Sequence, residues 1–209
     1  MITEEMLDRL RQEIGRELSP HRFAHTVSVE QECTSLADIL LPEKTAELRA
    51  AALLHDLTKE LSRDEQLLIC RDYGIRASDE AMESAAVLHG MTAAAILPKR
   101  FPELATDEIC RAIAKHTVGA AEMTVFDKIL FLADYIEPTR RYDACLSLRK
   151  HFYEELDARG ATDAIGVLDR AVMTAVCQTL THLIQKRMTI APESLALYNA
   201  LSKRKDFLG

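Results

Sequence analysis

The amino-acid sequence predicts an all-α protein, folded as a helical bundle around one hydrophobic core. Apolar residues recur at helical spacing in almost every segment, and no run of alternating β-branched residues is long enough to predict a sheet. Helix-start patterns precede several of these segments. With 209 residues, 48% of them hydrophobic, the chain can bury a substantial core as one domain, or as one domain with a helical extension.

The first helices are marked by capping residues and prolines. Residues 1–18 are predicted to form an N-terminal helix. Ser19 is a predicted N-cap with Pro20 at the first helical position, so a long helix begins there and stops before Pro42. A second helix is predicted over 44–57, where an apolar run leads into a His-Asp pair. The turn-prone stretch that follows is centred on Arg63, Asp72, Gly74 and Ser78-Asp79.

Helical character returns at about Glu80 and continues to His89-Gly90, and a further short helix is predicted to end near Leu97-Pro98. Thr106 begins another helix, whose inner face reaches His116. Thr124-x-x-Asp127 resembles a capping box and opens a helix that ends by Pro138.

Beyond Gly160, apolar residues from Ile165 to Leu183 trace a long amphipathic helix that closes the bundle. No repeat, low-complexity segment or Gly/Ser linker interrupts the chain, so a second independent domain is not expected. We therefore predict three parts of one domain: an N-terminal helix over 1–18, the main helical domain over 19–140, and a C-terminal helical part over 141–209 that packs on it.

Charge and cysteine content exclude several functional classes. Lys and Arg number 26 and Asp and Glu 33, which gives a net charge of −7. This charge argues against a broad surface for nucleic acids or anionic membranes, so any phosphate-bearing ligand should be small. Five cysteines without a C-x-x-C pair and the lack of a secretion signal favour a cytoplasmic protein with reduced thiols. No stretch is apolar enough to cross a bilayer.

A set of histidines and aspartates carries the chemical information. Each residue lies at or near the apolar face or the inner end of a predicted helix. One histidine on an apolar stripe is usually a hydrogen-bonded core residue, but two interior carboxylates each cost several kcal/mol unless a cation or strong donors compensate them. A bound metal ion supplies that compensation. The set is His25, His55, Asp56, His89, His116 and Asp134.

Imidazole and carboxylate ligands together favour a divalent transition ion, such as iron, manganese, cobalt or zinc, over calcium or magnesium. Six ligands could hold one ion, or two ions with Asp56 bridging them. In the second case His25, His55 and Asp134 bind one ion, while His89 and His116 bind the other. The sequence leaves both counts open.

The ordered pattern H, HD, H, H, D resembles the HD-domain phosphohydrolases, and the surrounding residues resemble the bacterial YqeK family within them. The resemblance runs from about Ser19 to Leu201. It is carried by HRFAHT (21–26), LLHDLTKEL (53–61), LHG (88–90), HTVGAAEMT (116–124), FLADYIEPTR (131–140) and IAPESLALYN (190–199).

This resemblance implies an HD-domain helical bundle and a symmetrical bis(5'-nucleosyl)-tetraphosphatase. Such an enzyme cleaves diadenosine tetraphosphate into two ADP molecules at an iron-containing site. Carried over to this chain, the resemblance implies His25, His55, Asp56 and Asp134 as metal ligands. The implied nucleotide-contacting residues are His21, Asp56, His89, His116, Thr117, Asp134 and Arg140.

The chemistry predicts further roles near the metal. Asp56 can orient or deprotonate the attacking water. Lys59, about one helical turn after Asp56, can hold that carboxylate or a phosphate, with an ordinary solvated lysine as the alternative. Arg140 has a fork suited to phosphate, with a surface arginine as its alternative. His21 begins a helix, where backbone N–H groups favour anions, and Thr117 can donate a hydroxyl. His151 and His182 are assigned to surface or packing roles.

Three other functions stay open. The same site could serve another nucleotide, such as a mono-, tri- or cyclic nucleotide. The chain could also be a nucleotide-binding regulatory module with little turnover, or a plain helical bundle with buried histidines and no metal. The oligomeric state is open as well, with a homodimer allowed for.

Overall fold

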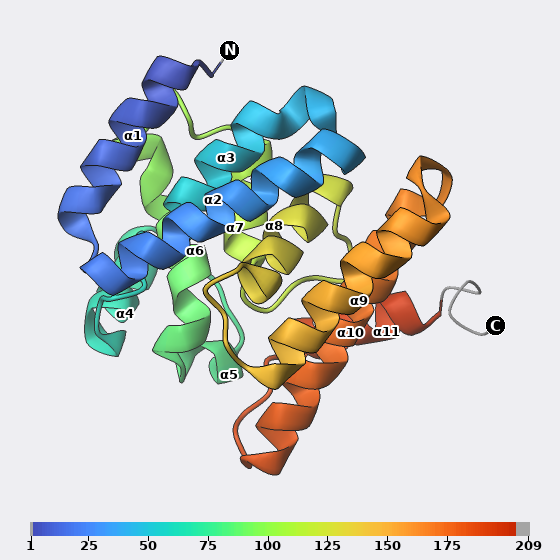
Figure 1. The fold of residues 1–209 in the computed structure, drawn as a ribbon. Coiled ribbons are helices and arrows are strands. Elements are labelled where there is room, and N and C mark those ends of the chain that lie inside the picture. Colours follow the sequence, from blue (N-terminus) through green and yellow to red (C-terminus); the bar gives the residue numbers. More distant parts are fainter. Residues whose placement is uncertain (1, 204–209) are drawn as a thin grey trace.

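The all-α prediction is confirmed by the computed structural model, which describes residues 2–203. In this range the chain forms α-helices, two short 3-10 helices and no strand (Figure 1). The elements are α1 (Glu4–Glu17), α2 (Pro20–Leu40), η1 (Pro42–Lys44), α3 (Thr45–Leu54), α4 (Arg63–Asp72), α5 (Asp79–Met82), α6 (Ala85–Arg100), α7 (Asp107–Lys115), α8 (Val125–Ile136), α9 (Asp143–Arg159), η2 (Ala161–Asp163), α10 (Ala164–Gln185) and α11 (Pro192–Ser202).

Local capping chemistry places the helix starts where the sequence predicted them. The Ser19 hydroxyl accepts a hydrogen bond from the backbone N–H of Arg22, with Pro20 in the first turn of α2. Thr124 and Asp127 form the reciprocal capping box that opens α8. Thr106 caps α7 through the N–H of Ile109. These starts fix the register at which the chemically important side chains face inward.

Three predicted boundaries were wrong. The helix predicted over 44–57 covers only Thr45–Leu54, so His55-Asp56 follow its end. The stretch after Ser62 is not a turn but the helix α4, because Ser62 and Glu65 form a capping box that the sequence analysis overlooked. The segment from Ala85 to Arg100 is one helix, which passes through Gly90 and carries Pro98 in its last turn. A proline removes only one hydrogen bond there, so the helix continues for two more residues.

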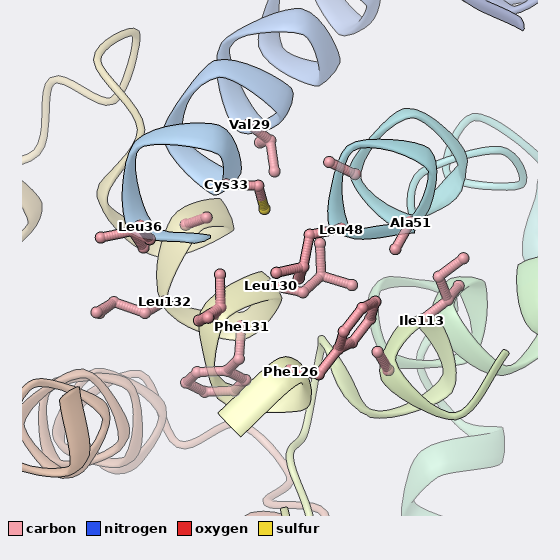
Figure 2. Packing of buried hydrophobic residues seen from close by; sticks show 14 of the residues in the cluster. Val29, Cys33, Leu36, Leu48, Ala51, Ile113, Phe126, Leu130, Phe131 and Leu132 are labelled. Carbon is pink, nitrogen blue, oxygen red and sulfur yellow. The ribbon is translucent and has the colours of Figure 1, made fainter. Parts of the chain in front are cut away.

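The hydrophobic core lies between α2, α3, α7 and α8. Figure 2 shows Val29 and Cys33 of α2 facing Leu48 of α3 and Leu130 of α8, with Phe126 reaching towards Ile113 of α7. All of these side chains are at most 1% exposed. This packing holds the four helices together as a rigid frame. The inward-facing ends of these helices meet beside the core.

The N- and C-terminal helices pack on the same core. Leu7 and Ile14 of α1 belong to it, as do Val172 of α10 and Leu197 of α11. Figure 1 shows α9, α10 and α11 side by side on one flank of α8. Residue 1 and residues 204–209, at the outer limits of the predicted parts 1–18 and 141–209, lie outside the described residues.

None of the described helices is both long and apolar enough to span a bilayer.

Candidate metal centre

Five helices bring the six predicted residues into one buried cluster. His25 lies in α2, His89 in α6 and Asp134 in α8, while His55-Asp56 and His116 directly follow the last residues of α3 and α7. The four histidines and Asp56 are at most 5% exposed, and the Asp134 side chain is 21% exposed. The cluster therefore opens to solvent on the side of Asp134.

His55 and His116 are oriented by the same local device. Each residue is the C-cap of its helix. The Nδ1 atom of His55 lies 2.6 Å from the carbonyl oxygen of Ala52, and Nδ1 of His116 lies 2.7 Å from that of Ile113. A carbonyl only accepts hydrogen bonds, so Nδ1 carries the proton in both rings. The unprotonated Nε2 atoms then point into the cluster, in the tautomer that binds metal ions.

His25 is oriented by Glu137, a residue to which the sequence analysis gave no role. Because Glu137 precedes Pro138, it leaves the helical conformation and ends α8. Its Oε1 atom lies 3.0 Å from Nδ1 of His25, and Thr139 donates to both of its oxygens from N–H and hydroxyl. Burial opposes its ionisation, but the hydrogen bonds from His25, Ser28 and Thr139 outweigh this effect and lower the pKa of Glu137 to about 2. Glu137 thus holds His25 with Nε2 inward.

We expect Glu137→Gln to lower the metal affinity about 10- to 100-fold, the usual effect of removing a carboxylate that orients a histidine ligand. The amide keeps the shape but has no charge, and its NH₂ group opposes the N–H of Thr139. Metal titration by calorimetry measures the change. Glu154→Gln on the exposed face of α9 is the matched control, and equal affinities of the two variants would refute the orienting role of Glu137.

Ligand atoms of His25, His55 and Asp134 lie within 4.8 Å of one another, and Asp56 Oδ2 adjoins both imidazoles. The Nε2 atom of His25 lies 3.0 Å from Asp134 Oδ1 and 3.5 Å from Asp56 Oδ2. The Nε2 atom of His55 lies 3.9 Å from Asp134 Oδ1 and 3.4 Å from Asp56 Oδ2. Ligands about 2.1 Å from a metal ion are separated by roughly 3 to 4 Å. The Nε2 atoms of His25 and His55 are buried and have no hydrogen-bond partner in the described chain. Two buried imidazole nitrogens beside two carboxylate oxygens fit a bound cation.

The electrostatics of the cluster also favour a cation. Burial opposes the charge on Asp56 and Asp134, but the surrounding imidazoles and Arg140 outweigh it and hold both carboxyl pKa values well below their usual range. Burial likewise opposes protonation of His25, yet Asp134 and Glu137 raise the pKa of His25 to about 9. The field that stabilises a proton on His25 Nε2 also stabilises a metal ion at the same place.

His89 and His116 form a second group on the other oxygen of Asp56. Nε2 of His89 lies 3.1 Å from Asp56 Oδ1 and 3.0 Å from Nε2 of His116. Because Nε2 of His116 is an acceptor, Nε2 of His89 carries the proton, and the Lys59 ammonium lies 3.4 Å from both nitrogens of His89. The N–H donor of His89 beside the Lys59 ammonium is better suited to bind a phosphate than to bind a second cation. A second group of three potential metal ligands consists of His55, Asp56 and His116, and it does not include His89.

Gly90 lets α6 approach α7 closely behind His116. A Cβ atom at this position would lie 2.8 Å from the carbonyl oxygen of Ile113 and 3.1 Å from Nδ1 of His116. That carbonyl is the acceptor that orients the His116 ring. The glycine is therefore required by the distance between the two backbones.

We expect Gly90→Ala to destabilise the protein by about 1–3 kcal/mol, the usual cost of overpacking a rigid contact, and to lower turnover by displacing His116. Thermal unfolding and initial rates measure the two effects. In Gly15→Ala the new Cβ meets only the Phe23 ring, which is not part of the cluster, so turnover should be unchanged. A Gly90→Ala protein with normal stability would show that the helices can separate freely.

Two arginines neutralise the two carboxylates. Arg140 donates from Nη2 to Asp134 Oδ1 at 2.6 Å and from Nε to the Asp134 carbonyl at 3.0 Å, because the Pro138 turn folds it back onto α8. Arg22 donates from Nη1 to Asp56 Oδ2 at 2.7 Å. No local sequence pattern assigns Arg22 a role, because its partner Asp56 is 34 residues away.

Two predicted residues stay outside the cluster. His21 is exposed and has no hydrogen bond or ion pair within residues 2–203. The hydroxyl of Thr117 donates to the carbonyl of Val87 at 3.2 Å, so it is already satisfied. Their predicted contacts with a nucleotide require a bound ligand and remain predictions.

A cavity of about 440 Å³ opens beside Asp134 and Arg140, between α8 and α10. Tyr135 donates from its hydroxyl to Oε1 of Gln178 at 2.9 Å, which leaves the Gln178 amide NH₂ free to bind a ligand. His182, expected only at a surface or packing position, is exposed but lines this cavity. The lining residues are Asp134, Tyr135, Arg140, Tyr142, Ala144, Cys145, Gln178, Thr179 and His182.

The chain is similar to a known family model and to several named proteins. The HD domain model matches residues 22–139, more than half of the chain. A protein of Halalkalibacterium halodurans named "Bis(5'-nucleosyl)-tetraphosphatase, symmetrical" is 30% identical over 88% of this chain and 90% of its own length. Proteins of the same name from Staphylococcus aureus and Bacillus subtilis are each 29% identical, over 87% and 90% of this chain and 87% and 93% of their own lengths.

A solved structure has the same fold. It is a crystal structure from Clostridium acetobutylicum, described as a predicted HD superfamily hydrolase involved in NAD metabolism. It is 28% identical to this chain, with a TM-score of 0.81 over 95% of this chain and 97% of its own. This description refers to NAD, whereas the names of the relatives above refer to bis(5'-nucleosyl) tetraphosphates.

Proposed function

The chain belongs to the HD-domain family and, within it, to the symmetrical bis(5'-nucleosyl)-tetraphosphatases of the YqeK type, and we propose that it hydrolyses diadenosine tetraphosphate to two ADP molecules. The observation that carries the proposal is the complete H, HD, H, H, D cluster in a chain that matches these relatives along nearly its whole length. A regulatory module that had lost turnover would be expected to lack part of this set.

The HD domain implies a divalent metal ion, and the mixed imidazole and carboxylate donors fit a transition ion. We propose iron, as the resemblance to the YqeK family implies, held by His25, His55, Asp56 and Asp134. When bound, such an ion lowers the pKa of a water molecule and polarises a phosphoryl oxygen. Elemental analysis of purified protein tests both the presence and the identity of the ion.

The residues of the chain supply the other requirements of phosphoanhydride hydrolysis. Asp56 orients the attacking water, since one of its oxygens faces the metal ligands and the other faces His89. His89 and Lys59 offer donors to a phosphoryl oxygen, and Arg140 holds a phosphate at the mouth of the cavity. Burial opposes the charge on Lys59 and lowers its pKa despite the attraction of Asp56 and Asp134. A bound phosphate would supply negative charge that offsets the cost of burying the Lys59 ammonium.

The cavity beside Arg140 fits one nucleoside of the substrate. Tyr142 at its rim, 73% exposed, offers an aromatic face to a base. The free amide of Gln178 and the imidazole of His182 offer hydrogen bonds. The cavity adjoins Asp134. The phosphates attached to a nucleoside in this cavity can therefore reach the metal ligands.

Product analysis on a panel of nucleotides tests the proposed activity. The panel contains diadenosine tetraphosphate, ATP, AMP, a cyclic nucleotide and NAD, because a structural neighbour is associated with NAD metabolism. ADP as the sole product from diadenosine tetraphosphate is the expected result. Turnover of another nucleotide with inertness towards the tetraphosphate would replace this substrate, and metal-loaded protein that cleaves none of them would be a binding module.

A further inference from the structure

Arg22 is the least explained charged group beside the metal centre. Its guanidinium donates to Asp56 Oδ2, and its side chain is 19% exposed. Its Nε is buried and has no hydrogen-bond partner in the described residues. A guanidinium has five N–H donors in a planar fork, so one bond to Asp56 leaves most of its donor capacity for a further acceptor.

A continuous series of contacts through the cluster links Arg140 at one end to Arg22 at the other. Arg140 contacts Asp134, Nε2 of His25 lies between Asp134 and Asp56, and Asp56 contacts Arg22. Only Arg140 is part of the wall of the α8–α10 cavity. Arg22 lies in the first turn of α2, whose cap residue Ser19 is hydrogen-bonded to Glu60 just before α4, and Figure 1 draws this end of α2 away from α9 and α10. The two cations thus flank the cluster on different sides.

The chemistry of a symmetrical tetraphosphate calls for two such cations. Water adds its oxygen to one central phosphorus, and the bond between that phosphorus and the bridging oxygen breaks. The electron pair stays on the bridging oxygen, which becomes a terminal oxygen of the other ADP, and the protons of the water leave to solvent. Negative charge therefore grows on the half that departs. Arg140 serves the half in the cavity, and Lys59 lies beside His89. A further cation beside Asp56 would stabilise the charge that grows on the departing half.

We propose that Arg22 is a catalytic residue that binds the departing diphosphate half of the tetraphosphate. The proposal rests on the tetraphosphatase function. Arg22 neutralises Asp56 through its contact with Oδ2. When a cation occupies the ligand set, it takes over that task and the fork of Arg22 can turn to phosphate.

Binding of two probes to Fe²⁺-loaded protein tests this role. One probe is ADP, which needs only the cavity side. The other is a diadenosine tetraphosphate analogue with a methylene group in place of the central bridging oxygen, which must occupy both sides. We expect Arg22→Gln to weaken the analogue about 10- to 100-fold, the effect of one lost charge-assisted hydrogen bond, and to change ADP affinity less than about twofold. Arg22→Lys should lose part of the analogue affinity, because lysine keeps the charge but lacks the fork.

Arg16→Gln, an exposed arginine in the last turn of α1, is the matched control and should affect neither probe. Equal analogue affinity in wild type and Arg22→Gln overturns the proposal. So does a parallel loss of both probes together with the bound iron, because Arg22 would then only position Asp56. If the wild-type protein neither binds the analogue nor cleaves the tetraphosphate, the proposed function itself fails.

Discussion

Asp56→Asn should reduce hydrolysis of diadenosine tetraphosphate at least about 10³-fold, which corresponds to about 4 kcal/mol of activation barrier. Asp56 joins the two halves of the cluster, with Oδ2 beside His25 and His55 and Oδ1 beside His89. Asparagine keeps the volume but removes the charge, and its NH₂ group cannot bind a cation or accept a hydrogen bond. The substitution therefore weakens a metal ligand and the group that orients water in one step.

Steady-state rates and elemental analysis together measure the effect of Asp56→Asn. Circular dichroism should show unchanged helix content, since the core of α2, α3, α7 and α8 does not include Asp56. Asp72→Asn, at the exposed end of α4, is the control and should retain both metal and turnover. A folded Asp56→Asn protein with full metal content and normal rates would mean that the catalytic centre lies elsewhere.

The helix starts were predictable because they depend on residues within four positions of each other. Ser19 with Pro20 and Thr124 with Asp127 act through their own side chains and the adjacent backbone. Ser62 with Glu65 is a pattern of the same kind, so α4 could have been predicted. It was missed because charged residues and Gly74 made the stretch look like a loop. Pro98 was misleading for a different reason, since it lies in the last turn of its helix, which ends two residues later.

The cluster of six residues was predictable from residue type and from positions on inner helix faces. Their supporting groups were not. Glu137 contacts His25 across 112 residues and Arg22 contacts Asp56 across 34, and no local pattern encodes such pairs. The cavity depends on how α10 packs against α8, which brings His182 near Asp134. Sequence spacing on α10 alone predicts only an exposed histidine.

Removal of the metal should abolish turnover and lower the thermal stability of the protein. The Nε2 atoms of His25 and His55 are buried without hydrogen-bond partners, and two carboxylates lie beside them. An ion that binds only the folded chain stabilises it by about 4 kcal/mol at a concentration 1,000 times its dissociation constant. For a chain of this length each kcal/mol shifts the melting temperature by roughly 2–4 °C, so chelation should lower it by roughly 8–16 °C.

Calorimetric scans before and after dialysis against a chelator measure this shift, and added Fe²⁺ should restore both stability and turnover. The same scans on Asp56→Asn separate a specific site from general binding of metal to the acidic surface. Ion binding at the cluster predicts a much smaller shift in this variant and a full shift in Asp72→Asn. An equal shift in all three proteins would place the stabilising ion outside the cluster. The absence of any shift, with turnover intact after the metal has been removed, would mean that the chain catalyses hydrolysis through its own acids and bases.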